Sequence, residues 1–425
     1  MIGTLLTAFL LSAAPASATV SERCVTCHEQ RSPGVVADWR LSRHSQVAVS
    51  CDACHGDAHQ GDGDAAKARL PTPETCKQCH PGQVEQFGKG KHAAAWAAMK
   101  AMPTFHKQPM AAMEGLKGCG GCHKLGLKSE AETRDLVKAT GGHGNASCDA
   151  CHTRHTFSKK EALQPQACQT CHMGFDHPQW EMYSGSKHGV RNGLKQMGIL
   201  PPSAAAPTCQ DCHMQGGNHE VRAAWGFLAV RLPLADDPTW KADQVTILQG
   251  LQVLDPQGKP TGRLDVVKAA DVARLTKEAF DAERSKMIET CSRCHSPAFA
   301  KGELARSDDM IREADHLMAE AIREVAGLYR DGIVAPPKGG LAFPDLLTFH
   351  DAGTVVEQKL FVMFLEHRMR AFQGAFHANP DYALWYGWSE MQRDLSEIRA
   401  LAHEMRAAAT PPKKPAAAKT KGAKP

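Results

Sequence analysis

CQTCHMGFDHPQWEMYSGSKH, residues Cys168–His188, is the stretch around which the other motifs of this 425-residue chain are arranged. It begins with Cys-x-x-Cys-His, a sequence typical of covalent c-type haem attachment. The two cysteines bond the haem vinyl groups, and the adjacent histidine binds the iron. Asp176 and His177 follow shortly after this motif, and His188 lies further on. The stretch therefore predicts a haem site, a carboxylate–imidazole pair suited to proton chemistry, and a second histidine able to bind iron.

The same motif occurs eight times and uses all 16 cysteines of the chain. Paired Cys-x-x-Cys motifs also bind zinc, but zinc does not require a histidine directly after each second cysteine. No cysteine remains for a disulfide, and the sequence therefore predicts eight covalently bound haems. In chain order the motifs are Cys24, Cys27 and His28; Cys51, Cys54 and His55; Cys76, Cys79 and His80; Cys119, Cys122 and His123; Cys148, Cys151 and His152; Cys168, Cys171 and His172; Cys209, Cys212 and His213; and Cys291, Cys294 and His295.

Covalent haem is attached outside the cytoplasm, so we expect an export signal and a periplasmic mature protein. Residues 1–18 contain the apolar run Leu5–Leu11 and end in Ala16-Ser17-Ala18, a typical cleavage site. A basic residue near the start is missing, which makes the signal peptide atypical. The alternative, a membrane anchor, is weaker because the apolar run is too short to span a bilayer. The net charge of +4 is too close to neutral to suggest nucleic-acid binding.

The haem-binding region, residues 19–295, is expected to consist of loops and short helices packed on porphyrin, including a short helix at Lys91–Lys100. Within it, Val245–Val267 reads as two strands around a Pro/Gly turn, a surface hairpin. The predicted fold is mainly α, a multihaem cytochrome c with little sheet.

Beyond the last motif, residues 296–408 show apolar residues at helical spacing. Long helices are expected at Asp308–Tyr329, Gly353–His377 and Trp388–Ala408. Residues 409–425 are rich in Lys, Pro and Ala and are expected to be a disordered tail.

Electron-transfer haems usually need a second axial ligand. Histidines in loop-like contexts among the motifs are the candidates, with His106 as the alternative to any of them. The histidines at the C-terminal helices are expected to have ordinary polar roles. Seven second ligands for eight haems would leave one iron open. The seven candidates are His44, His59, His92, His143, His155, His188 and His219, and the C-terminal histidines are His316, His350, His367, His377 and His403.

His177 differs from these candidates because Asp176 precedes it and Pro178 follows it. A carboxylate–imidazole pair can move protons to or from a small substrate bound to iron. The alternative is that Asp176 only caps a helix formed by the following residues, QWEMY.

Several segments resemble the octahaem hydroxylamine oxidoreductase (hydroxylamine dehydrogenase) family, and the resemblance covers nearly all of the mature chain. From the fourth motif onward the chain is also similar to pentahaem nitrite reductase, whose catalytic histidine lies in an H-P-E segment between its third and fourth haems. The segments that carry the resemblance are CHTRHTF (Cys151–Phe157), CHMGFDHPQWEMYSGSKHG (Cys171–Gly189), CQDCHM (Cys209–Met214), GNHEVRAAWGF (Gly217–Phe227) and AFHANPDYALWYGW (Ala375–Trp388).

The resemblance implies that the fourth haem, on Cys119, Cys122 and His123, is catalytic and that Asp176 and His177 form its distal pocket. In oxidising members of the family, a tyrosine after the last haem is covalently bonded to the catalytic porphyrin. A neighbouring subunit of a homotrimer donates it, and reductive members lack it. Among four tyrosines, Tyr382 is the first choice for this cross-link and Tyr386 the second. The alternative is that both are packing residues.

Together these features predict a periplasmic enzyme that oxidises hydroxylamine to nitric oxide or nitrite, a step of nitrification and nitrogen metabolism. Seven haems with two histidine ligands would carry the electrons to an acceptor c-type cytochrome. The rival activities are hydrazine oxidation and the reduction of nitrite or hydroxylamine to ammonium. A non-catalytic electron wire is the remaining alternative, with His106 or His177 as the eighth second ligand.

Mass spectrometry of the mature chain is expected to show eight added haems and cleavage after Ala18. All 16 cysteines belong to haem motifs, so no thiol should react with an alkylating reagent after denaturation. Fewer haems or a titratable thiol would contradict the count.

Overall fold

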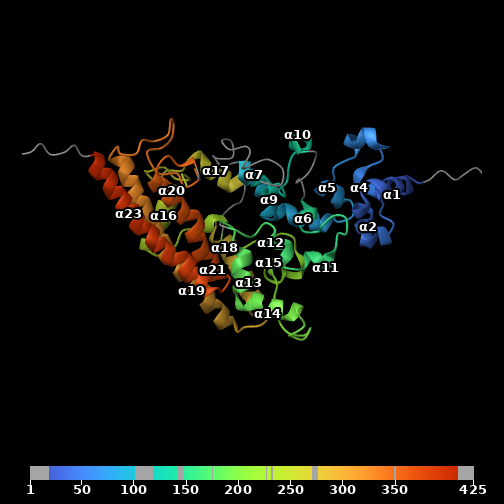
Figure 1. Ribbon diagram of the computed structural model, residues 1–425. Helices are drawn as coiled ribbons and strands as arrows, with labels where there is room; N and C mark the ends of the chain where they lie inside the picture. The colour runs from blue at the N-terminus through green and yellow to red at the C-terminus, as the bar shows by residue number, and fades with distance from the viewer. Residues whose placement is uncertain are drawn as a thin grey trace, which may run out of the picture. The chain divides into compact units, whose positions relative to one another are not determined.

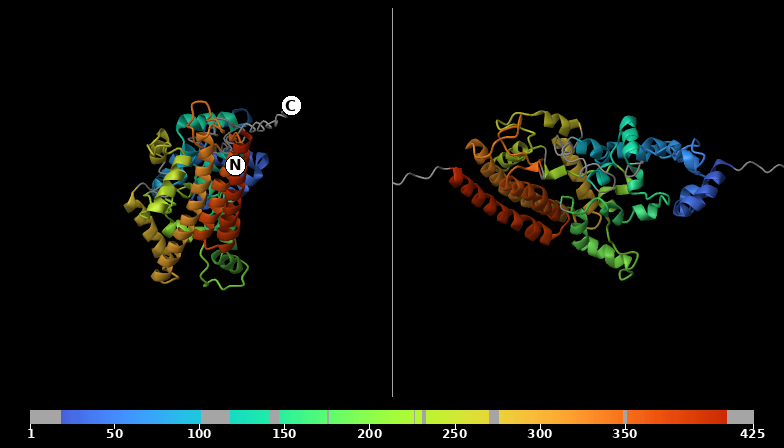
Figure 2. Two further views of the ribbon diagram at one scale, coloured as in Figure 1. Left: turned by 90° about the vertical axis from the view of Figure 1, so that its left-hand side faces the viewer. Right: turned by 45° about the horizontal axis from the view of Figure 1, so that its top comes forward.

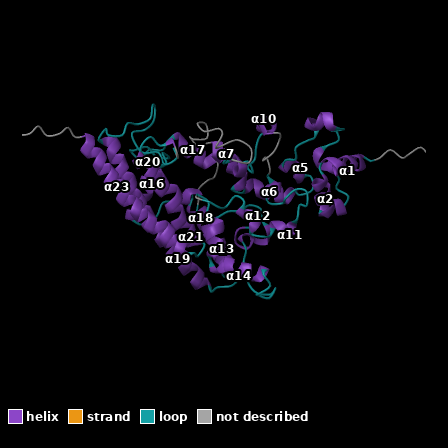
Figure 3. Ribbon diagram, in the orientation of Figure 1, coloured by secondary structure: helices purple, strands orange, loops and turns teal. Residues whose placement is uncertain are grey.

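The computed structural model describes residues 19–100, 118–140, 147–174, 176–225, 227–230, 233–269, 276–348 and 351–409. Within these ranges the chain forms helices and loops, and the strand-like pairing is one antiparallel bridge between Leu254 and Pro260 (Figure 3). The mainly α fold is confirmed. Segments 1–18 and 410–425 lie outside the described residues, as do His106, His143 and His350. None of the described helices is both long and apolar enough to cross a membrane.

The chain divides into two compact units, and the first consists of Met1–Cys79 with Cys148–Ala162. Its first helix begins with a capping box: the Glu22 backbone N–H donates to Thr19 Oγ1, and the Thr19 backbone N–H donates to the Glu22 carboxylate. The helices of this unit are α1 Val20–Arg31, α2 Pro33–Leu41, α3 Arg43–Gln46, α4 Cys51–His55, η1 Asp62–Lys67, α5 Pro73–Lys77, η4 Cys148–Ala150 and α11 Lys159–Ala162.

The second unit comprises His80–Ser147 and Leu163–Pro425. Its motif-bearing part is built from short helices, which include the expected helix at Lys91–Lys100 as η2 and α7. They are α6 Pro81–Lys89, η2 His92–Ala94, α7 Ala95–Lys100, α9 Gly120–His123, α10 Glu130–Thr140, α12 Gln166–Gln169, α13 Gln179–Gly185, α14 Lys187–Gln196, α15 Cys209–His213, η5 Gln215–Gly217, η6 Phe227–Ala229, α16 Pro238–Gly250, α17 Gly262–Ala269 and α18 Lys277–Cys291.

Long helices follow the last motif, as expected from the apolar spacing. α19 and α23 run side by side, and α16 and α21 also pack against α19 (Figures 1 and 2). The face that α19 buries includes Ala314, Met318, Ile322 and Val325, all fully buried and spaced as one helical stripe. The helices are α19 Pro297–Arg330, α20 Val355–Val362, η8 Met363–His367, α21 Arg368–Phe376, α22 Pro380–Ala383, η9 Leu384–Trp388 and α23 Ser389–Ala409, with η8 and η9 being π-helical turns.

The predicted hairpin at Val245–Val267 is wrong. Its first part belongs to α16, which begins where the Trp240 backbone N–H donates to Asp237 Oδ1 (2.7 Å). Ile247, Leu248 and Leu251 are buried in the same core as α19. Packing against a helical bundle has overridden the strand preference of this β-branched run. Only the Pro/Gly turn survives, between the bridged residues Leu254 and Pro260.

A buried ion pair ties α21 to α19. Arg368 donates to Asp315 Oδ1 through Nε (3.0 Å) and Nη2 (2.7 Å), and both side chains are almost completely buried. Arg368 also donates to the carbonyls of Leu228 and Ala229 at 2.7 and 2.8 Å. The same guanidinium therefore fixes the segment that leads into α16.

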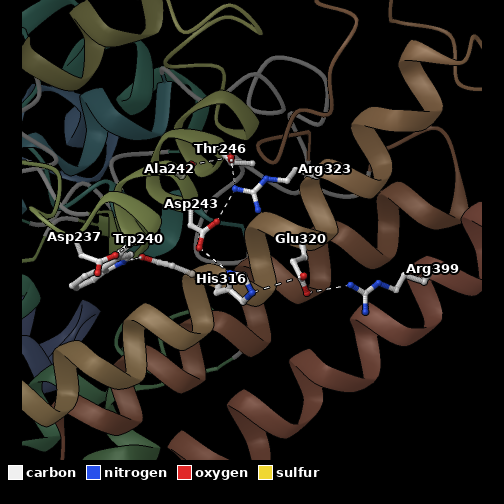
Figure 4. Close-up of polar contacts among 10 residues, drawn as sticks. Asp237, Trp240, Ala242, Asp243, Thr246, His316, Glu320, Arg323 and Arg399 are labelled. Atoms are coloured by element: carbon white, nitrogen blue, oxygen red, sulfur yellow. Dashed lines mark hydrogen bonds and ion pairs between the residues drawn. The ribbon is translucent and has the colours of Figure 1, made fainter.

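A second polar network joins α19 to α16 and α23. His316 and Arg323 of α19 both hold Asp243 of α16, and Glu320 of α19 accepts from Arg399 of α23 (Figure 4). These contacts join the same helices as the core; Asp243 is buried, but His316, Arg323 and Arg399 are about half exposed to solvent.

Arg368→Met should lower the free energy of unfolding by about 3–5 kcal/mol, because it leaves the carboxyl group of Asp315 in the interior without its ion-pair partner. Chemical denaturation followed by far-UV circular dichroism measures this change. The matched control is Arg399→Met, which breaks the exposed pair with Glu320 and should cost at most about 1 kcal/mol. Equal losses of unfolding free energy in the two variants would contradict the conclusion that the Arg368–Asp315 pair is a buried ion pair on which stability depends.

Candidate functional site

Three of the eight Cys-x-x-Cys-His motifs lie entirely within one helix. The second motif is the whole of α4, the seventh is the whole of α15, and the first lies within α1. Positions i, i+3 and i+4 lie on one face of a helix. The local fold therefore turns both sulfurs and the histidine of a motif toward the same side, as covalent haem attachment requires.

The fifth and eighth motifs, which are not whole helices, close the same turn through backbone hydrogen bonds to the carbonyl of their first cysteine. In the fifth motif the His152 backbone N–H donates to the Cys148 carbonyl (3.1 Å), and in the eighth the His295 backbone N–H donates to the Cys291 carbonyl (3.0 Å). The thiols of all eight motifs are exposed or partly buried, so each sulfur can reach a haem vinyl group. Those classed as exposed are Cys27, Cys79, Cys119 and Cys294.

Six of the motif histidines face a second histidine at a nearly constant separation: His123 with His177, which is described below, and five others. Two imidazoles on opposite sides of one metal ion have ring centres about 6 Å apart, because metal–nitrogen bonds are about 2 Å long. The observed pairs fit a haem iron held between two rings. The centroid separations are 6.2 Å for His28–His59, 6.2 Å for His55–His155, 5.9 Å for His172–His92, 6.1 Å for His295–His188 and 6.4 Å for His213–His377.

Four of the predicted second ligands, His59, His92, His155 and His188, thus lie opposite motif histidines. Two further candidates lie beside the remaining motifs. The His219 backbone N–H donates to Gln86 on α6 (3.1 Å), the helix that begins directly after motif histidine His80. The ring of His44 lies 5.1 Å from that of Phe157, in the segment after motif five.

His377, expected to have an ordinary polar role, instead faces His213. It ends α21, and its Nδ1 lies 2.8 Å from the carbonyl oxygen of Gln373. Burial lowers the pKa of His377, and burial together with His377 lowers the pKa of His213 to about 4, so both favour the neutral, metal-binding form. The missed signal was the sequence after His377, Ala-Asn-Pro, which breaks the helix there.

The other described C-terminal histidines have no comparable partner on a motif. His316 pairs with Asp243, His367 pairs with the buried Asp394, and His403 is exposed. Their polar roles agree with the expectation.

The structure brings Asp176 and His177 to the fourth motif. The ring of His177 lies 6.0 Å from that of His123 and 6.3 Å from that of His172. Its Nδ1 is 2.9 Å from Asp176 Oδ1, and both side chains are largely buried. Burial alone would raise the pKa of Asp176, but the hydrogen bond and charge of His177 outweigh it and hold that pKa below its usual value.

Asp176 does not cap the following helix, so that alternative is wrong. α13 has Pro178 at its N-cap position, with no side-chain hydrogen bond there. The carboxylate of Glu181 instead accepts from the Gly174 backbone N–H (2.9 Å). Asp176 is thereby left to orient the His177 ring. The centroid distance to His123 alone allows His177 to be either an iron ligand or a pocket residue.

Tyr382 lies in α22, where its backbone N–H donates to Asn379 Oδ1 (3.3 Å) and its ring packs 5.0 Å from that of Tyr386. Burial and the nearby Glu181 raise the pKa of its phenol. The adjoining η9 exposes Trp385 and Tyr386 by 63% and 52%. The two candidate tyrosines thus lie next to an exposed aromatic surface.

Contacts between cysteines show which motifs are neighbours. In the first unit, Cys24 interacts with Cys51, Cys54 with Cys76, and Cys76 with Cys148, so the order is one, two, three, five. In the second unit the order is four, six, seven, eight. There, Cys122 contacts Cys171, Cys168 contacts Cys209, and Cys212 interacts with Cys291. Spatial order therefore departs from sequence order at the fourth and fifth motifs.

Residues 47–232 and 264–340 match the family described as "seven times multi-haem cytochrome CxxCH", and residues 10–56 match the family of cytochrome c554 and c-prime. A probable nitrite reductase–hydroxylamine oxidoreductase fusion protein of Kuenenia stuttgartiensis is 26% identical, with 91% of this chain and 52% of that protein aligned. The high-molecular-weight cytochrome c of Nitratidesulfovibrio vulgaris is 25% identical over 35% of this chain and 28% of its own length. The chain thus spans about half the length of the first curated relative and less of the second.

Two solved structures are similar. A reducing HAO-like protein complex of Kuenenia stuttgartiensis matches with a TM-score of 0.66 and 25% identity, covering 91% of this chain and 85% of that chain. A hypothetical multihaem protein matches with a TM-score of 0.62 and 18% identity, covering 91% and 96%, and shows the fold alone.

His377→Ala is expected to convert one low-spin haem to a high-spin form, because it removes the ring opposite His213. Electron paramagnetic resonance of the oxidised protein measures the change. His316→Ala, which removes a histidine bonded to Asp243, should leave the spin states unaltered. An unchanged spectrum for His377→Ala would exclude it as a ligand.

Proposed function

Because this chain belongs to the multihaem cytochrome c family, we propose that it is an octahaem oxidoreductase that oxidises hydroxylamine to nitric oxide or nitrite. The proposed site is the fourth motif, Cys119, Cys122 and His123. The observation that carries the proposal is the Asp176–His177 pair, whose imidazole lies beside the His123 ring. Haem bound at the motifs supplies the redox chemistry and conducts the electrons.

The residues of the pocket handle protons. Hydroxylamine releases protons as well as electrons when it is oxidised, so a nearby base assists the reaction. Asp176 accepts from Nδ1–H of His177, which fixes the tautomer and leaves Nε2 as the basic nitrogen. The carboxylate also stabilises the imidazolium formed when Nε2 takes a proton.

The other seven motifs would use histidine pairs and pass electrons to an acceptor c-type cytochrome. The five facing pairs support this, as do the placements of His44 beside motif five and His219 beside motif three. His44 would then serve opposite His152. With His377 included, seven second histidines serve seven motifs, and the fourth is left for substrate. His143, which the sequence predicted as a second ligand, lies outside the described residues; a ligand role for it in addition to these seven would fill the fourth site.

Three further features complete the proposal. The mature protein is periplasmic after removal of residues 1–18, and it assembles as a homotrimer. Tyr382, with Tyr386 as the alternative, is the tyrosine that bonds the catalytic porphyrin of a neighbouring subunit. The exposed aromatic residues beside Tyr382 support a subunit contact there.

Reduction of nitrite or hydroxylamine to ammonium is the second candidate. It is favoured by the likeness to a complex described as reducing and to a fusion protein named in part as a nitrite reductase. Hydrazine oxidation uses the same pocket chemistry. A non-catalytic electron wire would instead require His177 or His106 to bind the eighth iron.

His177→Ala is expected to keep all haems and all spin states, and to slow hydroxylamine turnover by about 10²- to 10⁴-fold, the usual contribution of a general base. Asp176→Asn should slow turnover by about 10- to 100-fold through its effect on the imidazole. Steady-state kinetics and resonance spectra of the same samples provide the comparison. A low-spin haem that becomes high-spin in His177→Ala would identify His177 as a ligand and support the wire.

Tyr382→Phe tests the direction of the reaction. We expect wild-type protein to show covalent oligomers on a denaturing, reducing gel, and Tyr382→Phe to remove them. The variant should also lose hydroxylamine oxidation but keep reductive activity. Tyr386→Phe is the matched control, because the two rings are neighbours in the same segment. Wild-type protein that runs as a monomer with an ordinary c-type spectrum would instead favour the reductive candidate.

A further inference from the structure

One axial histidine pair carries a carboxylate that no proposed function uses. Nδ1 of His59, which faces His28, lies 2.8 Å from Asp64 Oδ1. The backbone N–H groups of Gln60 and Gly61 donate to the same oxygen, each at 3.0 Å. The Asp64 and His59 side chains are about one-fifth and one-quarter exposed. The loop therefore holds the carboxylate in one place against the ring.

The other histidines of the five pairs have neutral partners where a partner is described. Nδ1 of His28 meets Ser32 Oγ (2.7 Å), and Nδ1 of His55 meets the carbonyl of Arg69 (3.0 Å). His172 meets the amide oxygen of Gln179 (3.2 Å). Within the described residues of these pairs, His59 alone is bonded to a carboxylate.

We propose that Asp64 is a positioning residue that makes His59 an unusually strong iron ligand and thereby lowers the reduction potential of the first haem. An aspartate is ionised at neutral pH. A carboxylate that accepts the Nδ1–H of a metal-bound imidazole raises the basicity of the ligating nitrogen. A more basic ligand stabilises Fe(III) relative to Fe(II), and hydrogen bonding to the iron ligands is an established lever on haem potentials.

Two neighbouring charges bear on the size of the effect. Lys67 Nζ approaches the other Asp64 oxygen at 3.5 Å, but that side chain is 64% exposed, so solvent screens its charge. Asp62, in the same short helix η1, pairs instead with Arg31, and both are about two-thirds exposed. Asp62 carries the same charge as Asp64 and no described contact with His59, which makes it a matched control.

The consequence concerns electron transfer in the first unit. The first motif is the end of the series one, two, three, five set by the cysteine contacts. A lowered potential at this end makes its haem harder to reduce, and readier to give an electron away, than it would be without Asp64. This inference rests on the proposal that His59 is a second ligand, and it is independent of the substrate.

The experiment is a redox titration of the full-length, fully haem-loaded protein, followed by optical and resonance spectroscopy. Asp64→Asn keeps the shape of the side chain and removes its charge. It should leave the number of low-spin haems unchanged and raise one midpoint. At a fixed potential the Fe(III)/Fe(II) ratio of that haem should fall about tenfold, which corresponds to about 59 mV for one electron.

Two companion variants decide the interpretation. His59→Met should raise the same midpoint, which assigns it to the first haem, and Asp62→Asn should leave all midpoints unaltered. Unchanged midpoints in Asp64→Asn would overturn the inference. So would an equal rise in Asp62→Asn, which would show a general charge effect, or a high-spin haem in Asp64→Asn, which would show that Asp64 only holds the ligand in place. If His59→Met alters no midpoint, His59 is not a ligand, and the ligand proposal itself fails.

Discussion

Pairs of imidazole rings with centres about 6 Å apart join the distant segments of this chain. One ring of each pair comes from a helical turn that also carries two cysteines, and the other comes from elsewhere in the sequence, as in His213 with His377 or His55 with His155. An iron bound between two such rings would tie these segments together. Many short helices can therefore pack with little sheet and, in the first unit, with few buried apolar side chains.

The features that depend on neighbouring residues could be predicted from the sequence, whereas those that depend on contacts between distant residues could not. The residues of a Cys-x-x-Cys-His motif lie at positions i, i+3 and i+4 of the same short segment. The haem-binding cysteines and their histidines could therefore be predicted from the sequence alone. Histidines between the motifs, such as His59 in a loop and His188 in α14, were predicted as second ligands, and their rings lie 6.2 and 6.1 Å from those of motif histidines. Their pairing could not be read, since a facing partner such as His155 depends on tertiary packing. His377 was missed because it ends a long helix far from any motif, where a polar role is the usual one.

The error at Val245–Val267 has a related cause. Its apolar residues are typical of a strand by composition, but in the structure the first of them belong to α16 and pack against the buried face of α19. The order of the motifs in space was equally beyond the sequence, because the contact of Cys76 with Cys148 joins segments that lie far apart in the chain.

Beside the haem motifs, an aspartate–histidine pair occurs in two different settings. At His59, the carboxylate of Asp64 is fixed by backbone N–H groups and faces a ring that is itself paired with a motif histidine. At His177, Asp176 is the adjacent residue, and the ring lies within reach of both His123 and His172. A carboxylate that accepts a hydrogen bond from an iron-bound imidazole alters the properties of the metal. A carboxylate that accepts one from an unbound imidazole alters the strength of that imidazole as a base. The two settings differ in whether the imidazole binds iron.

Counting the low-spin and high-spin haems of the oxidised wild-type protein tests whether His59 binds iron and His177 does not. Quantitative electron paramagnetic resonance with near-infrared magnetic circular dichroism counts low-spin haems with two histidine ligands. We predict seven of them and one haem with an open position, at His123. Eight haems with two histidine ligands would fill the position left for substrate, with His177 or a histidine such as His106, and contradict the assignment of the fourth motif as the catalytic site.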